Sequence, residues 1–197
     1  MEILFSRHGE TDTNVNGKTH RRDDEMGLNA AGKLQSSKLA DAAAKHNVRA
    51  IFTSPAKRAI ETAQIVGRPL GLQPIVVDDL RERDWGDWNS EPWAEIEPRL
   101  KRMTLEERYT FIPLNGESWK QMDERLKRAV DKIAQTVTGN VMVITHGGAL
   151  RAIVPNLKRE ELTQSLSYNF DNASVTSFSF SPPDTYAVLT ENNTSHL

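Results

Sequence analysis

The feature that most constrains the fold of this chain is a set of short, uninterrupted apolar runs separated by longer amphipathic segments. Four runs are present, at residues 3–5, 50–53, 75–77 and 141–145. A strand with one face in water alternates apolar and polar residues, whereas continuous runs of this length are typical of strands buried on both faces. The runs therefore predict parallel strands in a sheet that is covered by helices on each side.

Helical periodicity occupies the segments between the runs. Apolar residues recur at helical spacing through 56–66 and again, over a longer stretch, through 119–137. We expect Ser54 to be the N-cap of the first helix, and Ser118 and Gln121 to form a capping box at the start of the second. Strands that alternate with helices predict an α/β layered fold.

The chain is predicted to be a single domain over residues 1–190. Its long middle region, 84–117, carries a further helical stripe and is expected to form a helical insertion over the ligand-binding end of the sheet. Residues 174–180 and 186–189 predict a closing hairpin around a Pro-Pro pair. The polar tail, 191–197, is expected to be loose.

Composition excludes several classes of protein. The net charge is −2 and the pI is near 6.2, which gives no indication of binding to nucleic acid or to an anionic membrane. The absence of cysteine excludes disulfides, thiolate catalysis and cysteine-ligated metals. The N-terminus resembles no signal peptide, and no apolar run is long enough to span a membrane. We therefore expect a cytoplasmic enzyme or binding domain.

The predicted strand ends carry mainly positively charged side chains. Arg7 and His8 end the first strand, Arg58 lies in the helical turn after the second, and His146 ends the fourth. Glu82 follows the third. Since ligands bind at the carboxyl ends of the strands in open α/β sheets, these side chains should meet in one pocket. Such a pocket, with helix N-termini beside it, favours a tetrahedral oxyanion and above all phosphate.

The same residues suit phosphoryl transfer. Arg7 would hold the phosphate while His8, whose neutral imidazole is a good nucleophile, attacks phosphorus. Asn14 would donate a further hydrogen bond, and Glu82 fits the general acid that protonates the leaving oxygen. The five histidines show no spacing typical of metal ligands, so no metal site is expected.

With these motifs in place, the sequence resembles the histidine phosphatase superfamily, also called the phosphoglycerate mutase-like family. Several family motifs follow in the correct order and span residues 3 to about 180. They are Arg7-His8-Gly9-Glu10-Thr11 with Asn14, Ser54-Pro55-Ala56-Lys57-Arg58, Leu80 and Glu82 with Gly86 and Trp88, Gly116-Glu117-Ser118, Thr145-His146-Gly147-Gly148, and Asn172 with Ser174.

The resemblance implies a three-layer α/β/α sandwich with a mostly parallel central sheet, and a reaction without metal or cofactor. It implies that His8 becomes a phosphohistidine and that Glu82 donates a proton to the leaving group and then helps to activate water. The residues expected around the phosphoryl group and substrate are Arg7, Arg58, His146, Asn14, Thr145, Gly147 and Arg21, the last from a charged loop at 18–25.

Three functions stay open from the sequence. The first is a phosphatase acting on a small phosphorylated metabolite, which the compact chain and the Gly86-x-Trp88 pattern favour. The second is a mutase that returns the phosphoryl group to a sugar acid such as phosphoglycerate. The third is a module that only binds phosphorylated ligands, although a pure binder needs neither nucleophile nor acid. The protein is expected to be a monomer or a homodimer.

Some residues also have a purely structural interpretation. Glu82 stands between Arg81 and Arg83 and could belong to an ordinary surface ion pair. Arg151 lies one turn into a helix, which favours a structural role. Three tryptophans could line the pocket or pack in a core: Trp85, Trp88 and Trp93.

Overall fold

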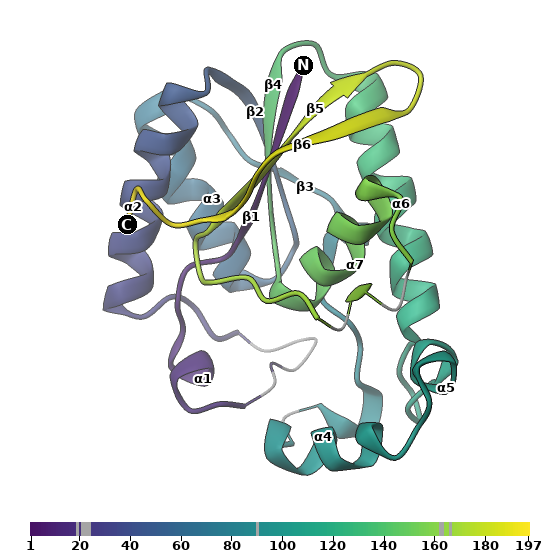
Figure 1. Cartoon of the computed structure of the whole chain (residues 1–197). Helices are drawn as coiled ribbons and strands as arrows, with labels where there is room; N and C mark the ends of the chain where they lie inside the picture. The colour runs from purple at the N-terminus through teal and green to yellow at the C-terminus, as the bar shows by residue number, and fades with distance from the viewer. Residues whose placement is uncertain (19, 21–24, 90, 162–163, 166) are drawn as a thin grey trace.

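Six strands form one mixed sheet in the computed structural model, which describes residues 1–18, 20, 25–89, 91–161, 164–165 and 167–197. The strands are β1 (Glu2–Arg7), β2 (Val48–Thr53), β3 (Ile75–Val76), β4 (Asn140–Thr145), β5 (Val175–Ser181) and β6 (Thr185–Asn193). Their order across the sheet is β3-β2-β4-β1-β5-β6 (Figure 1). The first four are parallel, while β5 and β6 are antiparallel. The four predicted strands and the closing hairpin are confirmed.

Helices cover both faces of this sheet, as the continuous apolar runs predict. In the described residues they are α1 (Asp12–Val15), α2 (Ala30–Lys45), α3 (Lys57–Leu70), α4 (Trp93–Lys101), α5 (Leu105–Thr110), α6 (Trp119–Thr136) and α7 (Gly147–Lys158), with 3-10 turns η1 (Asp78–Leu80) and η2 (Gly86–Trp88). Helices α2 and α3 lie on one face, and α6 and α7 lie on the other (Figure 1).

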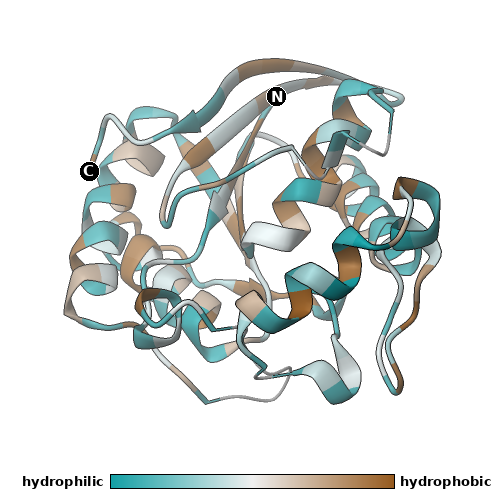
Figure 2. Cartoon of the chain, turned by 60° about the horizontal axis from the view of Figure 1, so that its bottom comes forward, coloured by the Kyte–Doolittle hydropathy of each residue, from teal (hydrophilic) through white to brown (hydrophobic). Residues whose placement is uncertain are grey.

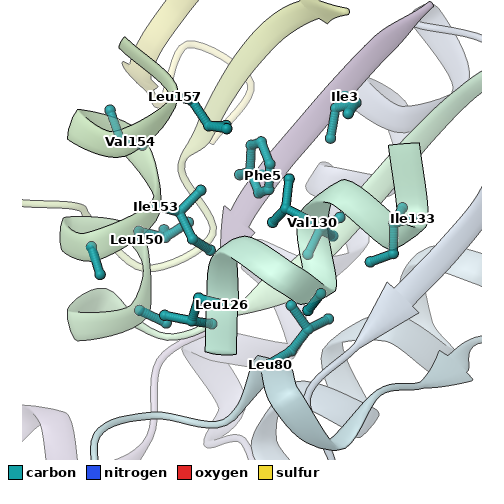
Figure 3. Close-up of a cluster of buried hydrophobic side chains, with 14 of the residues drawn as sticks. Ile3, Phe5, Leu80, Leu126, Val130, Ile133, Leu150, Ile153, Val154 and Leu157 are labelled. Atoms are coloured by element: carbon teal, nitrogen blue, oxygen red, sulfur yellow. The ribbon is translucent and has the colours of Figure 1, made fainter. Parts of the chain in front are cut away.

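Successive residues of the central strands point into two different cores. Leu4 packs with α2 and α3, whereas Ile3 and Phe5 pack with α6 and α7. Figure 3 shows Phe5 of β1 close to Val130 of α6 and Ile153 of α7. All three strand residues are fully buried. Because side chains alternate between the faces of a strand, only an uninterrupted apolar run can fill both cores, which confirms the α/β/α prediction.

The structure corrects three details of the sequence interpretation. Helix α3 begins at Lys57 with Ala56 as its N-cap, so Ser54 does not cap it. Strand β6 continues to Asn193, and the His196 ring contacts the Ala173 carbonyl at 3.0 Å, so the tail from 191 is not loose as a whole. Helix α2 had no predicted counterpart, because its buried face consists mainly of small residues (glycine, serine and alanine) rather than large apolar ones.

The short elements gather at the carboxyl ends of the parallel strands. Helices α1, α4 and α5 lie beyond that end of the sheet, at the bottom of Figure 1. Figure 2 brings this end forward, and the helices there carry both hydrophobic and hydrophilic residues. Within the described residues, no helix combines the length and the apolar character needed to cross a membrane.

Candidate active site

The pairing of β1 with β4 brings two histidines together. Arg7 is opposite Thr145 in this parallel pair, and the His8 N–H donates to the Thr145 carbonyl at 2.9 Å. His8 and His146 are therefore the next residues on neighbouring strands, and their ring centroids are 5.3 Å apart. Two residues that are 138 positions apart in the sequence become neighbours through strand register alone.

His8 is buried in a single tautomer. Its Nδ1 lies 2.7 Å from the Gly9 carbonyl oxygen. A carbonyl only accepts hydrogen bonds, so Nδ1 carries the proton and Nε2 keeps its lone pair. Burial, together with the positive charges of Arg58 and Arg7, lowers the pKa of His8 well below its usual range. The imidazole is thus neutral at physiological pH, the state that a nucleophile requires.

His146 has the opposite tautomer. The Arg58 guanidinium donates to its Nδ1 at 3.2 Å, which leaves Nε2 as the protonated nitrogen, and that nitrogen donates to the Ser54 hydroxyl at 2.7 Å. Burial and the charge of Arg58 lower the pKa of His146 well below its usual range. Ser54, predicted to cap a helix, instead orients this histidine.

Arg7 presents an unsatisfied donor. Its Nη1 donates to the Phe170 carbonyl at 2.8 Å, but its Nε is buried and has no hydrogen-bond partner in the described residues. Burial lowers the pKa of this guanidinium, against the opposing effect of Glu82. A buried polar group without a partner costs free energy, so a ligand that accepts from it is favoured. An oxyanion is such a ligand.

Glu82 is held over the beginning of α7. Its two carboxylate oxygens accept from the backbone N–H groups of Arg83 at 2.9 Å and Gly148 at 2.8 Å. A Cβ at Gly148 would stand 2.3 Å from Glu82 Oε1, so only glycine allows this approach. The neighbouring Arg81 pairs with Asp78, and Arg83 donates to backbone carbonyls. The surface ion-pair interpretation of Glu82 is therefore not supported.

One cavity of about 250 Å³ collects these groups. Trp85 and Trp93 line it while also packing with Ile96, so both of their proposed roles hold, and Arg151 lines it as well. The predicted site residues in its lining are Arg7, His8, Asn14, Arg58, Glu82, His146 and Gly147.

One predicted substrate-binding residue of the described part of the chain, Thr145, does not join this group. The Thr145 hydroxyl donates to the Leu80 carbonyl at 2.7 Å, and Thr145 is not among the residues that line the cavity, so the structure gives no support to the predicted contact of Thr145 with phosphate. This hydrogen bond instead connects the segment that carries Glu82 to strand β4. Arg21 lies outside the described residues. Gly9, which follows His8, is required for close packing against α2, since a Cβ there would be 2.5 Å from the Gly32 carbonyl oxygen.

Three further residues position or line the site, and no role was predicted for any of them from the sequence. His20 lines the cavity, with its ring centroid 5.8 Å from that of His8. Asn172 donates to the His8 carbonyl at 2.9 Å, and only its place in a family motif pointed to it. Arg125 of α6 donates to the carbonyls of Asp79, Arg81 and Glu82 at 2.8–3.0 Å and so fixes the segment that carries Glu82.

The buried histidines predict a pH dependence of stability. Below about pH 6.5, the unfolded chain protonates these imidazoles while the native state does not, because their folded pKa values are lowered. The free energy of unfolding should therefore fall as the pH decreases, by up to about 1.4 kcal/mol per pH unit for each group. Urea unfolding of wild type and His8→Asn between pH 7.5 and 5 checks this. The variant should have the shallower slope, and equal slopes would contradict the assignment.

Comparison with known proteins adds to this geometry. A family model described as histidine phosphatase superfamily (branch 1) matches residues 3–194. The chain is 31% identical to Phosphoglycerate mutase-like protein 4 of Arabidopsis thaliana, over 100% of this chain and 86% of the relative. It is 35% identical to the Metal-independent phosphoserine phosphatase of Arabidopsis thaliana, over 77% of this chain and 66% of that protein. A solved mycobacterial glucosyl-3-phosphoglycerate phosphatase matches with a TM-score of 0.85 at 26% identity, covering 97% of this chain and 98% of that one.

Proposed function

The chain belongs to the histidine phosphatase superfamily, and from this premise we propose that it hydrolyses small phosphomonoesters through a phosphohistidine on His8. Similarity to a phosphoserine phosphatase and to a glucosyl-3-phosphoglycerate phosphatase supports phosphatase activity. The cavity is somewhat below the roughly 300–1,000 Å³ of pockets for drug-sized ligands, which supports a small metabolite as substrate.

In the proposed first step, the lone pair of His8 Nε2 attacks phosphorus and the bond from phosphorus to the ester oxygen breaks. Arg7, Arg58 and the N-terminus of α7 offset the charge of the phosphoryl oxygens. In phosphoryl transfer, positioning and charge stabilisation provide most of the catalysis. Because these groups come from the chain itself, the proposal includes no metal ion.

Glu82 takes part in both halves of the proposed reaction. In its protonated form it donates a proton to the departing ester oxygen, which leaves as an alcohol. The resulting carboxylate then removes a proton from water, which attacks the phosphohistidine. Inorganic phosphate leaves, and the His8 lone pair is restored with Glu82 protonated again. Proton transfer of this kind typically contributes about 10²–10⁴-fold to the rate.

One observation carries the proposal: a neutral, buried histidine of fixed tautomer shares a cavity with Arg7, Arg58 and the carboxylate of Glu82. The arginines alone would suffice to bind phosphate. A module that only binds needs neither the free Nε2 lone pair nor the carboxylate of Glu82. The combination therefore favours catalysis over binding alone.

Phosphate release without added metal tests the proposal. We expect the purified protein to release phosphate from aryl phosphate, phosphoserine, phosphoglycerates and sugar phosphates to different extents, at rates that excess EDTA does not change. The guanidinium groups should provide the neutralisation that a cation provides elsewhere. Loss of activity in EDTA, restored by a divalent cation, would contradict metal independence. Isomerisation of phosphoglycerate without release would instead indicate the mutase.

A further inference from the structure

A second cavity adjoins the one that contains His8. It lies between α4, α5 and α6, and it shares Arg83, Trp85, Trp93, Trp119 and Arg151 with the first cavity as common walls. A substrate with its phosphoryl group beside His8 can therefore direct its organic part into this second space. The residues that line only the second cavity then act on the leaving group and not on the phosphate.

The charge of this lining is entirely positive. Among the described residues it contains three arginines, namely Arg83, Arg108 and Arg151, and no acidic side chain. Burial lowers the pKa of Arg83 to about 10, and the positive charge of Arg108 acts in the same direction, although Glu117 and Glu82 oppose them. Cations that are gathered without an acid in a partly enclosed space favour an anionic guest.

Arg108 of α5 is the arginine whose bonding capacity is unused. Arg83 donates to the carbonyls of Glu117 and Phe111 at 3.1 and 3.0 Å, and its guanidinium lies 4.1 Å from the Trp85 ring centroid. Arg108, by contrast, has a buried Nε without a partner, and its guanidinium forms no ion pair with any described residue. A buried donor left unpaired is costly, so this group is suited to an acceptor that the substrate brings.

We propose that the second cavity recognises a carboxylate on the leaving-group side of the substrate, and that Arg108 is the residue that binds it. This inference rests on the proposed phosphatase function for its link to turnover, but binding of the carboxylate does not require turnover. It defines the substrate as a phosphomonoester of a small organic acid. Arg108 is then a specificity-determining residue that contributes little to phosphoryl transfer itself.

The size of the cavity favours a carboxylate over a second phosphate. Its volume is about 30 Å³, not far above the ~10–15 Å³ that one water needs. A planar carboxylate fits such a space better than a tetrahedral phosphoryl group does. Guanidinium also matches a carboxylate geometrically, through two parallel N–H donors. The tryptophan walls contact the short carbon chain between the two anions.

Binding measurements on His8→Ala, which prevents turnover, test the proposal. The probes are two matched pairs that differ only by a carboxylate: 3-phosphoglycerate against 2-hydroxyethyl phosphate, and 4-carboxyphenyl phosphate against phenyl phosphate. The tryptophans of the walls report binding through their fluorescence. We expect the carboxylate to lower Kd by about 10- to 100-fold in at least one pair, as for a charge-assisted hydrogen bond.

Arg108→Gln in the same background should reduce this preference to less than about threefold. Arg102→Gln is the matched control, because Arg102 is an exposed arginine at the end of α4 that does not line the cavity. The Arg102→Gln control should keep the preference for the carboxylate-bearing probes. This result would show that the preference comes from a local contact with Arg108 and not from the general field of positive charge. Arg108→Lys should restore part of it if the charge is what matters.

The outcomes for the carboxylate site and for the phosphatase function can be separated. Equal affinities within each pair, or equal losses in Arg108→Gln and Arg102→Gln, would overturn the carboxylate site. Release of phosphate from phenyl phosphate by the wild-type protein tests the phosphatase independently. A carboxylate preference without any release would keep the site and remove the proposed hydrolysis.

Discussion

Replacement of His8 by alanine is expected to lower kcat for phosphate release by at least about 10⁴-fold, the scale seen when an enzyme loses its nucleophile. The reason is chemical, because the variant lacks the imidazole whose Nε2 lone pair attacks phosphorus in the proposed first step. His146 cannot substitute, since its Nδ1 accepts from Arg58 and its Nε2 carries the proton that bonds Ser54. Steady-state release from an aryl phosphate measures the loss.

Acid quenching of the wild-type reaction should trap a phosphohistidine that is absent in His8→Ala. His46→Ala is the matched control, because His46 contacts Glu2 at the opposite end of β1 and does not line the cavity. That variant should keep wild-type turnover and the trapped intermediate. Full activity in His8→Ala, or a phosphorylated residue elsewhere, would overturn the covalent mechanism.

The sequence predicted the centre of the site because strand ends are encoded locally. Each apolar run stops within two residues of the end of its strand, so Arg7, His8 and His146 could be assigned to one edge of the sheet before their distances were known. Parallel register then leaves little freedom for the residues that follow the strands. The fold was predictable for the same reason, since two covered faces require continuous apolar runs.

The roles of the other site residues depend on long-range contacts that the local sequence does not encode. Ser54 resembles a helix cap, yet its hydroxyl accepts from His146, which is 92 residues away. Thr145 resembles a phosphate ligand, yet it bonds Leu80. Arg125 and Arg108 lie among other charged residues on helices, where most arginines are simply solvated. Only the packing of α5 and α6 against the site distinguishes them.

Glu82→Gln is expected to reduce kcat for alkyl phosphates by about 10²–10⁴-fold, the usual contribution of a general acid. Glutamine keeps an oxygen that can accept from Gly148 but has no proton to give to an alkoxide. A 4-nitrophenyl ester leaves as a stable anion and needs no such proton. For that ester, transfer of the phosphoryl group to His8 should slow by less than about tenfold.

Because Glu82 also activates water in the proposed second step, the variant should accumulate phosphohistidine. Stopped-flow measurement with 4-nitrophenyl phosphate should then show a burst of about one nitrophenolate per active site, followed by slow turnover. Glu124→Gln, which changes an exposed carboxylate of α6, should behave as wild type. Equal slowing of alkyl and nitrophenyl esters without a burst would assign Glu82 to binding or structure. The dependence on the leaving group thus separates proton donation from every role that merely positions the substrate.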